Sequence, residues 1–420
     1  MKILNLEDSE NALKKKKLLF EAGFEFKDCF SRADILFPDK NKWDIIEVKS
    51  GTQVKDINIH DVSFQKYVYE NKGIKIGKCF LMHLNNEYIR KGELDIEKLF
   101  IKEDITKEVE EHTNGIKERI DEMFKIINSE KSPKVSIGNQ CKDPYECPVC
   151  HCWDSLPENH VFCLYRGGKL SCELYDNGVE AIKDIPDNIK LNDKQDIQRD
   201  CEIHKKVHVD KNEVKQFLKK LEYPLHYLDF ETFSTAIPMF DGLKPYSNVP
   251  FQFSLHVIRK EGNKPEHYEF LYGGNGDPRK EFILALKKVL GDSGSVIAYN
   301  QSFETGRLKE LGEYFPEHKK WVEGVLIRII DLLVPFREFS YYNPKQHGSA
   351  SIKKVLPALT GKSYEGMDIG EGGTASVEFF NTTYNNKGDK KRIRESLLKY
   401  CCLDTEGMVW IVDKLREIVK

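Results

Sequence analysis

The sequence lacks the features that mark membrane, secreted or disordered proteins. No apolar run reaches the length of about 20 residues that a membrane-spanning helix needs, and the N-terminus becomes charged too early for a signal peptide. Internal repeats and low-complexity tracts are absent as well. Neither sign of charge dominates, because 65 Lys and Arg residues face 68 Asp and Glu residues, for a formal net charge of -3. We therefore expect a cytoplasmic globular protein without membrane contact, whose nucleic-acid binding, if any, comes from local basic patches.

Size and cysteine content narrow the class further. A chain of 420 residues with 40% hydrophobic residues is too long for one ordinary core, so we expect two or three domains. Eleven cysteines in a reducing compartment favour free thiols or metal ligands over disulfides, and five of them fall between Cys141 and Cys163. This clustering predicts a metal-binding or cluster-binding segment.

Hydrophobic periodicity and turn residues divide the chain into segments. Strands are predicted over 18–26, 32–38, 43–51 and 75–85, a helix over 56–73 and a long charged helix over about 105–128. The last ~200 residues begin with three predicted strands, followed by helix, strand, helix and a helical tail. The predicted fold class is therefore α/β or α+β, with domains over 1–140 and 223–420, a cysteine-rich segment over 141–172 and a connector over 173–222.

The stretch "HYLDFETFS" places two carboxylates in a run that otherwise reads as a buried strand. Side chains alternate along a strand, so Tyr227, Asp229 and Glu231 share one face while Leu228 and Phe230 share the other. At about 5 Å in an effective dielectric of ~20, such a carboxylate pair repels by roughly 3 kcal/mol. The pair therefore predicts either a bound cation or an edge strand with a solvated acidic face.

Two later segments favour the cation. "VIAYNQSFETGRLKEL" reads as a short strand that turns into a helix near Glu304, and "LLKYCCLDTEGMVWIVDKL" reads as a helix with Tyr400 and Asp404 stacked four residues apart. Four carboxylates in one pocket suit two divalent ions such as Mg²⁺ or Mn²⁺. Asp331 in "RIIDLLVPF" is an alternative to Glu304, although it reads more simply as a polar residue that ends a buried strand.

This order of motifs resembles the DEDD exonucleases of the DnaQ-like, RNase H-like superfamily, in the subtype with a tyrosine. "SIKKVLP" is similar to a helix start that lies between their second and third motifs. The resemblance implies a mixed sheet and 3′–5′ exonuclease activity, with Asp229, Glu231, Glu304 and Asp404 as metal ligands and Tyr400 orienting the attacking water. The second acid is usually Asp in that family, whereas Glu304 stands here.

A second motif lies near the N-terminus. "RADILFPDKNKWDIIEVKSG" contains Asp34 and then Glu47 and Lys49, which lie two apart and share a strand face, and "QKYVY" places Gln65 and Tyr69 on one helix face. The pattern resembles RecB-like PD-(D/E)XK nucleases of the restriction-endonuclease-like fold. The resemblance implies that Asp34 and Glu47 hold one or two divalent ions and that Lys49 steadies the water or the phosphate. Surface charges on a hairpin are the alternative.

The cysteine segment "CKDPYECPVCHC" fits the same family. RecB-like nucleases with an iron–sulfur cluster carry three cysteines after the nuclease core, and a 4Fe–4S cluster is implied here, with Zn²⁺ as the rival because two cysteines follow zinc spacing. A thiol cluster without metal is the third option. No helix is expected before the first strand, so the fourth ligand is open between Cys29 and the segment itself. The candidate ligands are Cys141, Cys147, Cys150, Cys152 and Cys163.

Taken as a whole, the chain resembles a bacterial family that fuses a RecB-like nuclease, a cysteine motif and a DnaQ-like exonuclease. The predicted function is a metal-dependent nuclease that hydrolyses phosphodiester bonds of DNA or RNA, with single-stranded nucleic acid as its partner. Two other functions stay open at this point: a nucleic-acid-binding or scaffold protein with impaired sites, and a nucleotidyl transferase or RNase H-type endonuclease on the same fold.

Overall fold

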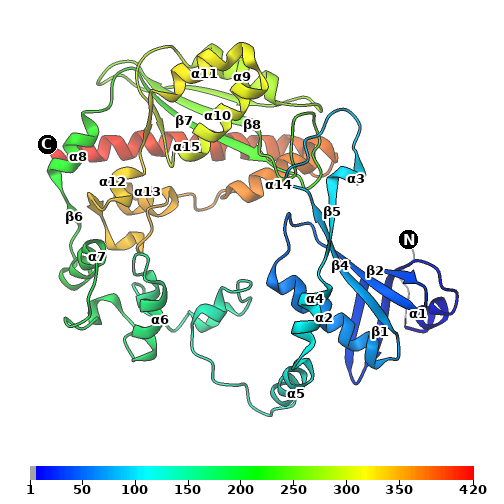
Figure 1. The fold of residues 1–420 in the computed structure, drawn as a ribbon. Coiled ribbons are helices and arrows are strands. Elements are labelled where there is room, and N and C mark those ends of the chain that lie inside the picture. The colour runs from blue at the N-terminus through cyan, green and yellow to red at the C-terminus, as the bar shows by residue number, and fades with distance from the viewer. Residues whose placement is uncertain (1–5) are drawn as a thin grey trace. The chain divides into compact units, whose positions relative to one another are not determined.

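The computed structural model describes the backbone of residues 6–420 and the side chains of these residues other than Leu6, Glu7 and Cys150. The chain contains both helices and strands, and both of its five-stranded sheets are mixed (Figure 1). It divides into two compact units, Met1–Val135 with Thr235–Ser247, and Ser136–Ser234 with Asn248–Lys420.

A five-stranded sheet forms the centre of the first unit, in the order β1-β2-β3-β4-β5. Neighbouring strands run antiparallel except β3 and β4, which are parallel and are joined by the crossover helix α2. The predicted strands and the predicted α2 are confirmed within a few residues. The elements are α1 (Leu6–Leu13), β1 (Leu19–Phe26), β2 (Cys29–Asp39), β3 (Lys42–Val48), α2 (Asp56–Asn71), β4 (Ile76–Leu84), α3 (Ile96–Leu99), β5 (Phe100–Asp104), α4 (Thr106–Thr113) and α5 (Ile116–Ile127).

Two expectations for this unit are wrong. The single helix predicted over 105–128 is two helices, because Gly115 adopts a left-handed conformation with φ of 77° that an α-helix cannot contain. A helix does precede the first strand, since α1 lies ahead of β1 and the hydroxyl of Ser9 accepts a hydrogen bond from the Gly23 amide at 3.2 Å. Its eight residues are largely polar, which hid its periodicity in the sequence.

The segment Thr235–Ser247 joins the first unit although it lies between two strands of the second. The guanidinium of Arg90 donates hydrogen bonds to the carbonyl oxygens of Pro238 and Met239 at 2.9 and 2.7 Å. The hydroxyl of Tyr246 donates to the carbonyl oxygen of Ser50 at 2.7 Å. The sequence carries no signal for this exchange, because a side-chain to backbone hydrogen bond across 196 residues of chain leaves no periodic pattern.

The second unit is built on a sheet in the order β11-β10-β7-β8-β9. β7 pairs antiparallel with β8 and parallel with β10, so it is a central strand, and the edge-strand interpretation of "HYLDFETFS" is wrong. The predicted run of three strands, helix, strand and helix is confirmed. The strands are β7 (Leu225–Phe233), β8 (Val249–Ile258), β9 (Glu266–Leu271), β10 (Val296–Ala298) and β11 (Ile329–Asp331).

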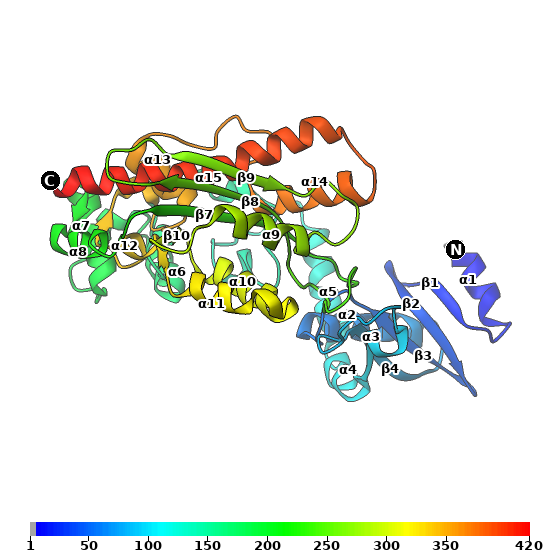
Figure 2. The same ribbon diagram turned by 90° about the horizontal axis from the view of Figure 1, so that it is seen from above.

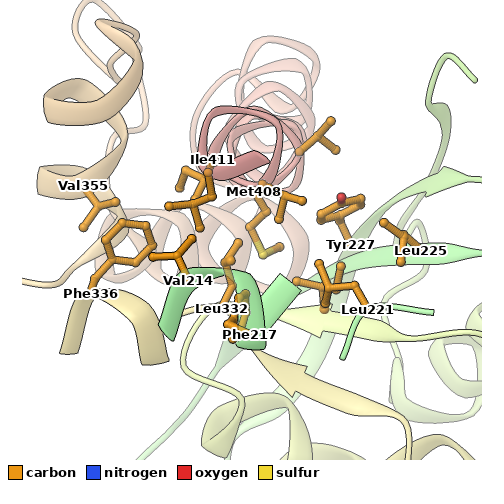
Figure 3. Close-up of a cluster of buried hydrophobic side chains, with 14 of the residues drawn as sticks. Val214, Phe217, Leu221, Leu225, Tyr227, Leu332, Phe336, Val355, Met408 and Ile411 are labelled. Atoms are coloured by element: carbon orange, nitrogen blue, oxygen red, sulfur yellow. The ribbon is translucent and has the colours of Figure 1, made fainter. Parts of the chain in front are cut away.

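Helices cover both faces of this sheet (Figures 1 and 2). Leu228 and Phe230 pack into one core with α9, α10 and α11, whereas Leu225 and Tyr227 pack into the other with α8, α13 and α15. Figure 3 shows the second core, in which Tyr227 lies near Met408 of α15. The predicted alternation of β7 is therefore confirmed. The helices are α8 (Lys211–Leu218), α9 (Arg279–Val289), α10 (Ser302–Tyr314), α11 (Lys319–Leu326), α12 (Val334–Arg337), α13 (Ile352–Thr360), α14 (Gly372–Tyr384) and α15 (Lys390–Val419).

The residues before β7, which include the predicted connector, form short helices. α6 (Gly168–Asp176) and α7 (Asp193–His204) follow the cysteine-rich segment, and β6 (His208–Val209) pairs antiparallel with β12 (Tyr341–Tyr342). A small cluster of buried aliphatic side chains, including Val161 and Ile182, holds this region together. Within residues 6–420, every helix falls short of the length or the apolar character needed to cross a bilayer.

Gly294 lies in the turn that leads into β10, and we predict that it tolerates no side chain. Its φ is +80°, and a Cβ there would lie 2.0 Å from the carbonyl oxygen of Pro224, just ahead of β7. Gly361 has a similar φ of +75° but open space around the Cβ position. Gly361→Ala should cost roughly 1–2 kcal/mol of unfolding free energy for its backbone alone, and Gly294→Ala roughly 3 kcal/mol or more. Equal losses in urea unfolding of the two variants would contradict this assignment.

Candidate active site

Asp229 and Glu231 lie on the face of β7 that α15 covers. Glu231 is 7% exposed, and the thiol of Cys401 on α15 lies 3.6 Å from Oδ2 of Asp229. Ligand atoms of Asp229, Glu231 and Cys401 all lie within 4.8 Å of one another. The first sequence motif therefore faces a helix, with Glu231 buried and Asp229 half-buried.

Glu304 comes from the first turn of α10, one residue after Phe303, as the strand-to-helix motif predicts. It is 3% exposed, and its Oε2 has no hydrogen-bond partner among the described residues. Asp331 ends β11, where its Oδ1 accepts hydrogen bonds from the amides of Asn300 and Leu333 at 2.9 and 3.0 Å. Asp331 therefore closes the turns at the ends of β10 and β11. Burial, and then the charge of Asp331, raise the pKa of Glu304.

Tyr400 and Asp404 lie one turn apart on α15 and both are buried. Oδ1 of Asp404 accepts a hydrogen bond of 2.5 Å from the hydroxyl of Tyr364. The rings of Tyr364 and Tyr400 are 6.1 Å apart. Two tyrosines therefore lie beside Asp404: Tyr400 from the third motif, and Tyr364 from outside it, which has no counterpart among the predicted residues.

The charges of these carboxylates act on one another. Burial raises the pKa of Asp229 well above its usual value, and the charges of the other three carboxylates raise it further. Burial is also the main reason why the pKa of Glu231 rises to about 8 and that of Glu304 to about 8. The pKa of Asp404 rises to about 7 for the same reason, although the Tyr364 hydrogen bond and the charge of Lys353 lower it. The structure thus brings all four predicted acids into one electrostatic group.

Lys353 supplies positive charge to this group. It lies in the first turn of α13, and its ammonium is 5.8 Å from the ring of Tyr400 and 5.9 Å from that of Tyr364. Its charge lowers the pKa of both Glu231 and Asp404. The motif "SIKKVLP" contains Lys353, so the sequence carried a signal for it, whereas Tyr364 lies in a loop after α13 and carried none.

The candidate site residues of the N-terminal motif also lie close together. Nζ of Lys49 lies 2.6 Å from Oε1 of Glu47 and 2.6 Å from Oδ2 of Asp61, and the amide of Gln65 donates to Oε2 of Glu47 at 2.8 Å. Oδ2 of Asp34 accepts from the amide of Val48 at 2.7 Å. Asp61 was missed by the sequence analysis, although it stands four residues before Gln65 on the same face of α2.

Burial and neighbouring charges also shift the pKa values of Glu47 and Lys49 in the N-terminal group. Burial raises the pKa of Glu47, and the charge of Asp34 adds to the rise, while hydrogen bonds from Lys49 and Gln65 oppose it. Burial alone would lower the pKa of Lys49, but its bonds to Asp61 and Glu47 together raise it. The hydroxyl of Tyr69 instead accepts from the Ala33 amide at 2.6 Å and donates to the carbonyl of Ala22 at 2.9 Å. Tyr69 therefore ties α2 to β1 and β2, and burial, followed by the charges of Glu47 and Asp34, raises the pKa of its hydroxyl.

The cysteine-rich segment is largely open. Cys147 and Cys152 are exposed, Cys141 and Cys163 are half-buried, and Cys150 lies outside the described side chains. Among the side chains that the structure describes, the cysteines of this segment form no group of three ligand atoms within 4.8 Å. Cys29 is buried at the start of β2. The predicted cluster or zinc site stays a prediction.

Comparisons with known proteins give relatives without an assigned activity. Residues 226–351 match a family described as a domain of unknown function, DUF2779. The chain is 28% identical over 230 residues to the uncharacterized protein MG366 of Mycoplasma genitalium, covering 50% of this chain and 34% of that protein. It is 29% identical over 222 residues to the MG366 homolog of Mycoplasma pneumoniae, covering 48% of this chain and 33% of that protein. It is 26% identical over 226 residues to the uncharacterized protein UU173 of Ureaplasma parvum, covering 48% of this chain and 32% of that protein.

The chain thus spans about a third of the length of these curated relatives. No solved structure matches the chain. The family match includes Asp229, Glu231 and Glu304 but ends before α15.

The buried carboxylates predict an unusual pH dependence of stability without added metal. Because the folded-state pKa values of about 7 to 8 exceed the unfolded ones near 4, the folded protein binds more protons between them. The free energy of unfolding should therefore fall as the pH rises from about 5 to 8 and level off above. Thermal unfolding in a chelator over this range tests it.

Two changes should flatten this pH profile. Glu304→Gln removes one titrating group, and saturating Mg²⁺ or Mn²⁺ supplies the missing positive charge. Glu395→Gln changes an exposed carboxylate on α15 and serves as the control. A chelated wild-type protein whose stability does not fall across this range would show that the group is not mutually repulsive.

Proposed function

We propose that the protein is a metal-dependent nuclease whose second unit removes nucleotides from the 3′ end of single-stranded DNA or RNA. The observation that carries the proposal is the convergence of Asp229, Glu231, Glu304 and Asp404 into one buried group with raised pKa values. Such a group is stable as four anions only beside concentrated positive charge. The mixed sheet with helices on both faces supports the RNase H-like fold that the motifs imply.

The residues fit divalent ions. Carboxylate oxygens are the ligands that Mg²⁺ and Mn²⁺ prefer, and Oε2 of Glu304 is buried without a partner among the described residues. The four acids would hold two such ions, which when bound activate a water and stabilise the leaving 3′ oxygen of a phosphodiester. The longer side chain of Glu304, in place of the usual Asp, still reaches the group, because its charge raises the pKa of Asp229 and of Glu231.

Neighbouring side chains position this machinery. The Tyr364 hydroxyl donates to Oδ1 of Asp404 and so would fix the orientation of this carboxylate as a metal ligand. Lys353 balances part of the negative charge and is placed to meet a substrate phosphate. Tyr400, whose hydroxyl the resemblance assigns to orienting the attacking water, lies one helical turn from Asp404.

The first unit is proposed as a second metal-dependent nuclease site of PD-(D/E)XK type. Asp34 and Glu47 would hold one or two divalent ions, and Lys49 would contact the water or the phosphate. The gathering of Glu47, Lys49 and Gln65 within hydrogen-bond distance supports this assignment. Asp61, which shares the Lys49 ammonium, fixes the lysine side chain beside Glu47. A 4Fe–4S cluster or Zn²⁺ in the cysteine-rich segment completes the proposal, and iron and zinc analysis of purified protein tests that part.

The central test is nuclease activity. Purified protein with Mn²⁺ should degrade single-stranded DNA or RNA from an accessible 3′ end, and Asp229→Asn or Asp404→Asn should reduce the rate by at least about 100-fold. Lys49→Ala, in the first unit, and Glu395→Gln, on the surface of α15, should leave 3′ degradation intact. End-labelled oligonucleotides blocked or free at the 3′ end identify the polarity.

A protein that binds oligonucleotides but cleaves none with Mg²⁺, Mn²⁺ or Co²⁺ would instead be a nucleic-acid-binding or scaffold protein. Glu304 at the second acidic position is the feature that favours this second function. Cleavage that is unchanged in Asp229→Asn and lost in Lys49→Ala would place the activity in the first unit alone.

Tyr364 offers a finer test of the site. Tyr364→Phe removes only the hydroxyl that orients Asp404, so the Mn²⁺ concentration needed for half-maximal activity should rise roughly 10-fold or more. Tyr268→Phe is a matched control, because that hydroxyl also donates to a carboxylate, Glu266, on the exposed strand β9. An unchanged Mn²⁺ requirement in Tyr364→Phe would mean that the hydroxyl does not position the ligand.

A further inference from the structure

A second cluster of metal-ligating side chains lies on the same side of the sheet, toward its edge. His256 on β8, His267 on β9 and Cys402 on α15 each offer one ligand atom, and these atoms all lie within 4.8 Å of one another. His256 and His267 are direct partners in the pairing of the two strands, and their rings stack at 4.4 Å. Unlike the carboxylate site, this cluster is built from nitrogen and sulfur.

Hydrogen bonds already orient both imidazoles. Nδ1 of His256 lies 2.8 Å from the hydroxyl oxygen of Thr405, and Nε2 of His267 lies 2.9 Å from that of Ser254. Metal-binding histidines usually donate the second ring N–H to an oxygen in this way, which fixes the tautomer. When Nδ1 of His256 donates to Thr405 and Nε2 of His267 donates to Ser254, the nitrogen lone pairs lie on Nε2 of His256 and Nδ1 of His267.

Protonation differs between the imidazole and the thiol of this cluster. Burial, and then the neighbouring His267, lower the pKa of His256 to about 4, so this imidazole is neutral near neutral pH, as a ligand must be. Burial, and then the charges of Glu406 and Glu269, raise the pKa of the Cys402 thiol to about 11, so an ion must displace the thiol proton when it binds. Half-buried Cys402 and exposed His267 leave one side of the cluster open, through which an ion enters and a water or carboxylate completes its coordination.

We propose that His256, His267 and Cys402 bind one transition-metal ion of the Zn²⁺ type, separate from the carboxylate site. Two imidazoles and one thiolate suit Zn²⁺ and disfavour Mg²⁺, which prefers oxygen. The ion ties the edge strand β9 and its neighbour β8 to α15, two residues from Asp404. It is a structural clamp on the helix that carries Tyr400 and Asp404, and it does not depend on the nuclease proposal.

The metal content of the purified 420-residue chain tests this site. Each protein is stripped with a chelator, reloaded with Zn²⁺ and dialysed. Cys402→Ser and His267→Asn should then each hold about one zinc per chain less than wild type. Cys172→Ser removes another half-buried thiol and should lose none. Cys147→Ser, in the cysteine-rich segment, separates zinc held there from zinc held by this cluster.

Co²⁺ gives a second readout. The charge-transfer absorption of a cobalt–thiolate bond should weaken in Cys402→Ser and in His267→Asn, but not in Cys172→Ser. His267 is exposed on an edge strand, so His267→Asn preserves the fold even if Cys402→Ser does not, and circular dichroism in the chelator checks both. Equal zinc content and equal cobalt absorption in folded His267→Asn and wild type would overturn the proposal, whatever the Mn²⁺-dependent nuclease assay shows.

Discussion

Mutual repulsion of buried carboxylates is the constraint around which the second unit is arranged. Asp229, Glu231, Glu304 and Asp404 come from β7, α10 and α15, and each has a raised pKa for which burial is the largest cause. Placing charge there costs free energy that Lys353 and the Tyr364 hydroxyl only partly offset. A fold tolerates such a cost when the group serves a ligand, so the remaining electrostatic deficit is itself an argument for bound cations.

The rigidity needed to hold these acids together comes from the position of β7. As a central strand it contributes Leu228 and Phe230 to one core and Leu225 and Tyr227 to the other, so apolar packing on both faces fixes its register. The carboxylates then occupy two positions of the Tyr227 face, where α15 covers them. Packing of α15 through Met408 and its neighbours thus places Asp404 opposite β7, and the same contacts stabilise both the core and the site.

How much of this could be predicted depends on whether a signal was local. The alternation of β7, the start of α10 at Glu304 and the one-turn spacing of Tyr400 and Asp404 are short-range patterns, and the structure confirms each as geometry. Tyr364 and the Thr235–Ser247 segment owe their places to the tertiary path of irregular chain, which has no period to detect. Tyr69 adds a contact that its motif did not indicate, because its hydroxyl also bonds the backbones of two strands.

The path of the chain also binds the two units together covalently. It passes between them at 135/136, at 234/235 and again at 247/248, so the β7–β8 connection is itself part of the first unit. Within that unit, Tyr246 of this connection donates to the carbonyl of Ser50, the residue after Lys49. Neither unit is a single uninterrupted stretch of sequence. Cutting the chain after Val135 would therefore not isolate the first unit. The strand that carries Asp229 and Glu231 would remain attached to the loop 235–247, and that loop would have lost its hydrogen bonds to Arg90.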